Sequence, residues 1–132
     1  PSLGECEKLL LRAAKLSREF GGMRQHAPFE ELIMTYKEHG RYCDGLAVCK
    51  ERLAYVDTGK DIPYEASVRG GLLYNTILCL SALGQHEEAS ELLENARTRK
   101  DVSEQWQRTF NSEEFLEEVS AYARIGRSAT TN

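Results

Sequence analysis

The sequence is poor in the features that mark several classes of protein. Four cysteines and ten glycines in 132 residues exclude a disulfide-rich scaffold and a collagen-like chain. The longest weakly polar run, 70–84, contains Asn75, Thr76 and Ser81, and it is shorter than the ~18 apolar residues of a membrane span. A hydrophobic content of 41% disfavours disorder. We therefore expect one folded domain without membrane insertion.

The cysteines lie too far apart for a metal-finger or redox motif. Cys6, Cys43, Cys49 and Cys79 form no CxxC pair. A zinc site from His39, Cys43 and Cys49 is disfavoured, because a glycine between the first two should end one helix before the next begins. We expect reduced, mostly buried thiols, no metal and no other cofactor. Such thiols are typical of an intracellular, cytoplasmic protein, and a mitochondrial location is the alternative.

Motifs of catalysis and of phosphate binding are missing as well. The chain has no GxxxxGK[ST] stretch, no GxGxxG stretch and no nucleophile elbow. The net charge of −4 argues against a protein whose overall field attracts nucleic acid, while a local basic face remains open. We therefore expect a protein that is not an enzyme.

One helical pattern occurs three times. The stretches 29–41, 73–85 and 115–127 align without a gap, and in each an apolar anchor is followed four, seven and eleven positions later by an aliphatic residue, a Tyr or Leu, and a glycine. This spacing predicts one buried helical stripe that ends at a glycine in the left-handed conformation. The stripes are Phe29, Ile33, Tyr36 and Gly40; Leu73, Ile77, Leu80 and Gly84; and Phe115, Val119, Tyr122 and Gly126.

A second helix is expected after each of the first two glycines, and the small residues Gly45 and Ala89 would let it approach the first closely. The second stripes are Tyr42, Leu46, Cys49 and Leu53, and His86, Ala89, Leu93 and Ala96. One domain, 1–132, then contains a leading helix (4–22), a first repeat (27–58), a second repeat (63–100) whose first helix runs from Pro63 to Leu83, a half repeat (112–126) capped by Ser112, and a flexible tail (127–132). Because this order starts and ends half-way through a repeat, we expect a section of a longer array or an array capped by a partner.

These residues resemble the tetratricopeptide repeat family. The large fourth, small twentieth and bulky twenty-fourth residues of its motif correspond to Phe29, Gly45 and Cys49, and then to Leu73, Ala89 and Leu93. The long period is similar to the extended subclass with repeats of roughly 40 residues, as in kinesin light chains. The resemblance implies an all-α fold of antiparallel helical hairpins stacked as a short right-handed solenoid. It also implies a scaffold or adaptor that binds a peptide or helix of a partner protein.

A second resemblance points to another function. A branched aliphatic residue occupies the position that this family usually keeps small, and this resembles pentatricopeptide repeats, which bind RNA in organelles. Three observations disfavour that reading: those repeats have about 35 residues, the net charge is negative, and the base-reading position holds Glu30, Tyr74 and Leu116. An RNA-binding or structural subunit of a mitochondrial complex remains the alternative function.

The tetratricopeptide resemblance implies a concave groove built by the first helix of each repeat. Tyr74 and Asn75 are favoured as its anchors, because an exposed aromatic residue beside an amide is frequent at interfaces. The alternative is that these side chains pack against the next hairpin or face water. The expected partner-binding residues are Glu30, Met34, Lys37, Tyr74, Asn75, Leu78, Leu116 and Ser120.

A basic cluster surrounds the single tryptophan of the chain. Interleaved cations and an aromatic ring can stack on RNA and neutralise it, or bind an acidic partner segment. The alternative, which we favour, is a solvated turn in which the tryptophan fills the gap between the second and third hairpins. The cluster comprises Arg97, Arg99, Lys100, Trp106 and Arg108.

Overall fold

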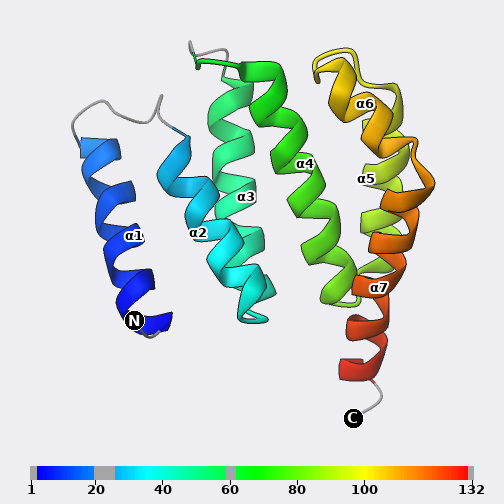
Figure 1. Ribbon diagram of the computed structural model, residues 1–132, viewed down its shortest axis with the longest axis horizontal. Helices are drawn as coiled ribbons and strands as arrows, with labels where there is room; N and C mark the ends of the chain where they lie inside the picture. Colours follow the sequence, from blue (N-terminus) through cyan, green and yellow to red (C-terminus); the bar gives the residue numbers. More distant parts are fainter. Residues whose placement is uncertain (1–2, 20–25, 59–61, 131–132) are drawn as a thin grey trace.

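The computed structural model of the protein describes residues 3–19, 26–58 and 62–130, and its regular structure in these ranges is entirely α-helical. The all-α prediction is therefore confirmed. The helices lie side by side in a row that follows the chain, and α1 to α4 run alternately up and down (Figure 1). They are α1 (Leu3–Glu19), α2 (Ala27–Glu38), α3 (Tyr42–Asp57), α4 (Glu65–Ala82), α5 (His86–Thr98), α6 (Glu104–Phe110) and α7 (Glu113–Thr130).

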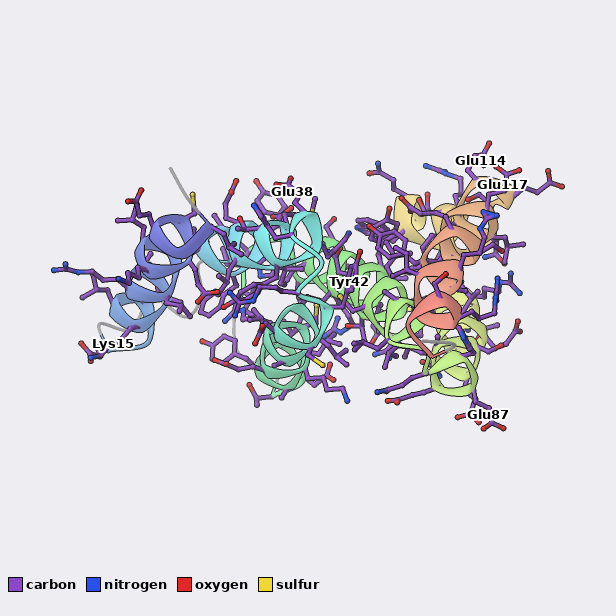
Figure 2. The ribbon with its side chains drawn as sticks, turned by 90° about the horizontal axis from the view of Figure 1, so that it is seen from below. Lys15, Glu38, Tyr42, Glu87, Glu114 and Glu117 are labelled. Carbon is purple, nitrogen blue, oxygen red and sulfur yellow. The ribbon has the colours of Figure 1, made fainter. Side chains whose placement is uncertain are left out.

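Helix α4 lies at the centre of the row. Seen from below, α2 and α7 lie to one side of it and α3 and α5 to the other (Figure 2). Most of its 18 residues are buried, as expected for a helix that is apolar on nearly all faces. The hydroxyls of Thr76 and Ser81 donate to the carbonyls of Leu72 and Ile77 at 2.6 and 2.8 Å, so these buried polar groups are satisfied within the helix.

The predicted glycine turns are confirmed at Gly40 and Gly84. Both residues adopt left-handed backbone conformations, with φ of 72° and 79°. After α2, the N–H of Arg41 donates to the Tyr36 carbonyl at 2.8 Å and the N–H of Gly40 donates to the Lys37 carbonyl at 3.1 Å. The same two bonds follow α4, so both helices end in a Schellman motif. Each turn sends the chain back along the helix that it has just completed.

The third glycine of the pattern has a different role. Helix α7 continues through Gly126 to Thr130, so the predicted helix end at 126 is wrong. A Cβ atom at Gly126 would lie 2.5 Å from the Ser81 carbonyl oxygen and 2.6 Å from the Gly84 nitrogen. The backbones of α7 and of the turn after α4 therefore cross in contact at this point. Gly126 is required for close packing, not for a left-handed turn.

The predicted stripes on α2, α3, α4 and α5 form most of the core. Phe29, Ile33 and Leu73 are almost fully buried, and Gly45 lies where a Cβ atom would touch the Cys79 sulfur at 3.4 Å. A buried cation joins this core, because the Arg52 guanidinium lies 4.1 Å from the centre of the Phe29 ring. In α5 the exception is His86, which is exposed.

Two of the expected helices, α4 and α1, differ in detail from the prediction. Helix α4 begins at Glu65, after Pro63 and a left-handed Tyr64 with φ of 57°. In α1, Leu9 and Leu16 are 69% and 43% exposed, so these two apolar side chains face outward. The predicted stop of the leading helix at 21–22 lies outside the described residues.

Helix α6 is a feature that the repeat pattern does not predict. The Ser103 hydroxyl accepts the Trp106 N–H at 3.5 Å and caps its start. Trp106 and Phe110, four residues apart, turn toward the core. A capping serine followed by this i, i+4 aromatic pair is the signal that could have revealed it. The predicted cap of α7 is confirmed, since Ser112 Oγ accepts the Phe115 N–H at 3.2 Å.

Trp106 packs directly on the backbone of α4. A methyl group at Gly70 would collide with the indole ring, whereas one at Gly71 would lie 3.6 Å from the ring, an ordinary contact distance. Close packing of the indole on α4 therefore depends on Gly70 and not on Gly71.

We predict opposite effects for two neighbouring substitutions. Gly70→Ala should lower the free energy of unfolding by about 1–3 kcal/mol, because the indole must move. Gly71→Ala should raise it by about 0.5–1 kcal/mol, because alanine is the better helix former and meets no obstacle. Urea unfolding followed by circular dichroism measures both, and equal changes of the same sign would contradict the Trp106 packing.

Candidate functional site

Five of the eight expected groove residues lie in three separate hollows, which we name by the helices that flank them. The α2–α4 hollow has a volume of about 260 Å³ and contains two of the expected residues, Glu30 and Asn75. Trp106 closes one end of it. Its complete lining is His26, Glu30, Ile33, Ser67, Val68, Gly71, Asn75 and Trp106.

The α4–α7 hollow is larger, about 510 Å³, and lies beyond Trp106 toward the end of the row. Of the expected groove residues it contains Tyr74, whose hydroxyl donates to the Glu118 carboxylate. The Tyr74 ring stacks on Phe115 at a centroid distance of 5.1 Å and lies 5.3 Å from the Trp106 ring. Its complete lining is Tyr74, Gln105, Arg108, Thr109, Ser112, Glu114, Phe115 and Glu118.

Leu116 and Ser120 lie in a third hollow. This α5–α7 hollow has a volume of about 340 Å³ and is lined by residues of both helices, so these two residues do not join the others. On α7, Phe115 stacks on Tyr74 of α4 and Tyr122 packs on Tyr42 of α3, whereas Leu116 and Ser120 lie on the side that lines this hollow. Its complete lining is Ser81, His86, Ala89, Ser90, Leu93, Leu116, Val119, Ser120, Ala123 and Arg127.

Lys37 is buried at the junction of α2, α4 and α7, where an open groove was expected. Its Nζ donates to Asn75 Oδ1 at 2.7 Å and lies 5.4 and 5.7 Å from the ring centres of Tyr74 and Tyr122. Burial lowers the pKa of Lys37, and the nearby Glu118 carboxylate partly opposes this shift. The cation therefore bridges three helices from within the fold.

Several expected groove residues are thus inaccessible to a partner. Leu78 is completely buried in the core, and Lys37 and Asn75 are 9% and 8% exposed. The expectation that these side chains line an open surface is wrong for Leu78, Lys37 and Asn75, because helix packing buries all three. Met34 is 40% exposed and Glu30 is exposed.

The basic cluster is largely neutralised within the fold. Arg97 pairs with Glu94 at 2.7 Å and donates to the Phe110 carbonyl, and Arg99 pairs with Asp101 at 2.7 Å. The Asp101 side chain also lies 3.4 Å from Arg69, a buried cation of α4. These contacts agree with a turn held by ion pairs.

The other two cations of the cluster and its tryptophan lie apart from those pairs. Lys100 and Arg108 are exposed, and only Arg108 lines the α4–α7 hollow. Trp106 belongs to α6 and is half-buried against Gly70 and Gly71 of α4.

The thiols carry no sign of metal or redox chemistry. Cys49 and Cys79 are buried and free, and burial raises the pKa of their thiols to about 12 and about 11. Cys43 is exposed and Cys6 half-buried. Among the residues that the structure describes, no three His, Cys, Asp or Glu side chains are grouped so that they could hold a metal ion.

None of the helices in the described ranges combines the length and the apolarity of a membrane span. No protein-family model, curated protein or solved structure matches the chain. The arrangement of its own side chains is therefore the ground for a functional proposal.

We predict that acid weakens the fold through His26, at the start of α2. Burial, and then the Arg52 cation, lower the pKa of His26 from its usual 6.5 to about 4. Between these two values the unfolded chain binds more protons, so the free energy of unfolding should fall as the pH falls from 6.5 to 4. Urea unfolding at several pH values measures this slope. His26→Gln should flatten it and His86→Gln, on an exposed residue, should not; identical slopes in all three proteins would contradict the assignment.

We also predict that the Tyr74 hydroxyl stabilises the fold. Burial, and next the hydrogen bond to Glu118, raise the pKa of Tyr74, so the hydroxyl stays protonated and donates. Tyr74→Phe should lower the free energy of unfolding by about 1–2 kcal/mol, because a bond to a charged acceptor is lost. The matched control is Tyr64→Phe, since Tyr64 is 85% exposed. Equal stability of both variants in urea unfolding would rule out a contribution from this bond.

Proposed function

We propose that this protein is a non-catalytic, tetratricopeptide-like interaction module, an intracellular scaffold or adaptor that binds a segment of a partner protein. In this proposal the helix pairs α2–α3 and α4–α5 are stacked hairpins of a short solenoid. Their glycine turns support it, because both pairs are joined by the same Schellman geometry. Packing of α4 on both α3 and α5 supports stacking of one pair on the next.

The observation that carries the proposal is the α2–α4 hollow. Two helices that begin successive pairs flank it, and Glu30 brings an exposed carboxylate to a partly apolar recess, while the Asn75 amide is engaged by Lys37 and by the Gly71 carbonyl. Ile33 and Val68 supply apolar lining. Such a mixture suits a peptide that inserts an apolar side chain and makes a few hydrogen bonds.

The state of the ionisable groups also favours binding over catalysis. The raised thiol pKa values of Cys49 and Cys79 keep these groups protonated at neutral pH, which makes them poor nucleophiles. The hydroxyls of Thr76 and Ser81 are engaged by backbone carbonyls of their own helix. These polar groups act as structural residues in the proposed module.

Nucleic-acid binding is less well supported. Phosphate recognition needs cations that are free to replace counterions, and Arg97 and Arg99 are already paired with acidic neighbours. Filter binding to single-stranded RNA distinguishes the two functions. An affinity that falls steeply with salt would favour the RNA-binding alternative.

The direct test of the proposed function is site-specific photo-crosslinking. A benzoylphenylalanine in place of Met34, which is exposed on α2 one turn from Glu30, should capture a defined partner from a cell extract. The matched control places the same group at Ala47, an exposed position of α3. Glu30→Lys should reduce the Met34 crosslink at least about threefold by reversing a charge in the hollow. Equal capture at both positions, or none at either, would contradict a binding face on α2.

A further inference from the structure

The α4–α7 hollow has the form and the charge of a receptor for a basic side chain. It has a volume of about 510 Å³ and shares no lining residue with the α2–α4 hollow. Three helices contribute to it: α4 through Tyr74, α6 through Arg108 and α7 through Glu114, Phe115 and Glu118.

Aromatic side chains form one wall of this recess. The Tyr74 and Phe115 rings, which both line it, stack at 5.1 Å with an angle of 25° between their planes. Phe115 is only 2% exposed, so the half-buried Tyr74 ring supplies the accessible edge. An alkyl stem such as that of Lys or Arg can lie along this edge while its charged head reaches polar groups.

Two carboxylates lie where that head group would arrive. Glu118 accepts the Tyr74 hydroxyl, which holds its carboxylate in place at the wall of the hollow. Glu114, one turn earlier on α7, is exposed, and it projects from the same edge of the molecule as Glu117 and Glu38, opposite Glu87 (Figure 2). A carboxylate positioned before binding loses less entropy when a cation arrives.

The acidic residues of α7 favour a basic ligand over an acidic one. The lining carries two carboxylates and the guanidinium of Arg108, and the Lys37 ammonium also interacts with Glu118. Glu113 and Glu117 add two further carboxylates near the start of α7, and the chain as a whole has a net charge of −4. A basic segment is attracted by this negative charge and an acidic segment or RNA is repelled.

We propose that the α4–α7 hollow binds a basic segment of a protein partner, with a Lys or Arg side chain laid along Tyr74 and its charge between Glu114 and Glu118. This rests on the proposed function, because it names the partner chemistry of an interaction module. It adds a second contact site to the one on α2.

The test uses the full chain and a fluorescein-labelled 12-residue peptide of alternating Lys and Leu, with binding measured by anisotropy. Glu114→Gln should weaken binding about fivefold or more, since it removes a charge pair. Glu117→Gln is the matched control, because it makes the same charge change on the same helix outside the lining, and it should change binding less than about twofold. Arg108→Gln should tighten binding by removing the opposing charge.

Three results would overturn the proposal. The first is an equal loss in Glu114→Gln and Glu117→Gln, which would indicate attraction by the general field alone. The second is equal binding of a peptide with Glu in place of every Lys. The third is displacement of the peptide by spermine at equal concentration, which would make the hollow a site for free amines.

Amide chemical shifts locate the bound peptide independently of affinity. In ¹⁵N-labelled protein the shifts should change at Gln105, Thr109 and Phe115, and changes confined to α1 or α3 would overturn the proposal. The outcome is separable from that of the proposed function. If the Met34 crosslink forms and the basic peptide does not bind, the module stands and this hollow is not its basic-segment site.

Discussion

The contact of Trp106 with Gly70 is the constraint on which the second half of the structure depends. The indole ring reaches the backbone of α4 only because residue 70 has no Cβ atom. This contact holds α6 against α4, and α6 in turn leads the chain into α7 beside α4. Tyr74 and Phe115 then stack, and the Tyr74 hydroxyl meets Glu118. The α4–α7 hollow is therefore a consequence of where one aromatic residue packs.

A second constraint separates the hollows from one another. Lys37 occupies the junction of α2, α4 and α7, where its ammonium group is held by Asn75 and two tyrosine rings. Burying a cation is favourable only with such partners, so the surrounding residues are committed to it. A continuous groove along α2, α4 and α7 is thereby interrupted. The structure has separate hollows there instead, one between α2 and α4 and one between α4 and α7.

The repeated pattern predicted the local structure well because its causes are local. A stripe at i, i+4 and i+7 and a glycine in the left-handed conformation are properties of one helix and its turn, and Gly40 and Gly84 behave accordingly. The same pattern was wrong for Gly126, which the helix passes through. In sequence, a glycine that ends a helix cannot be told from one that lets two backbones touch. The role of Gly126 is decided by Ser81 and Gly84, which lie next to it in the fold but far from it in the sequence.

The sequence by itself determined the helical class, the position of most helices and the apolar faces that form the core, since each follows from spacing along the chain. Tertiary structure alone decided which groove residues are accessible: it buried Leu78 and Lys37, left Glu30 and Met34 exposed, and turned Leu116 and Ser120 toward α5. This accessibility depends on the short helix α6, because packing of its Trp106 and Phe110 sets the rotation and position of α7. Exposure is a property of what packs on a residue, and that partner lies far away in sequence.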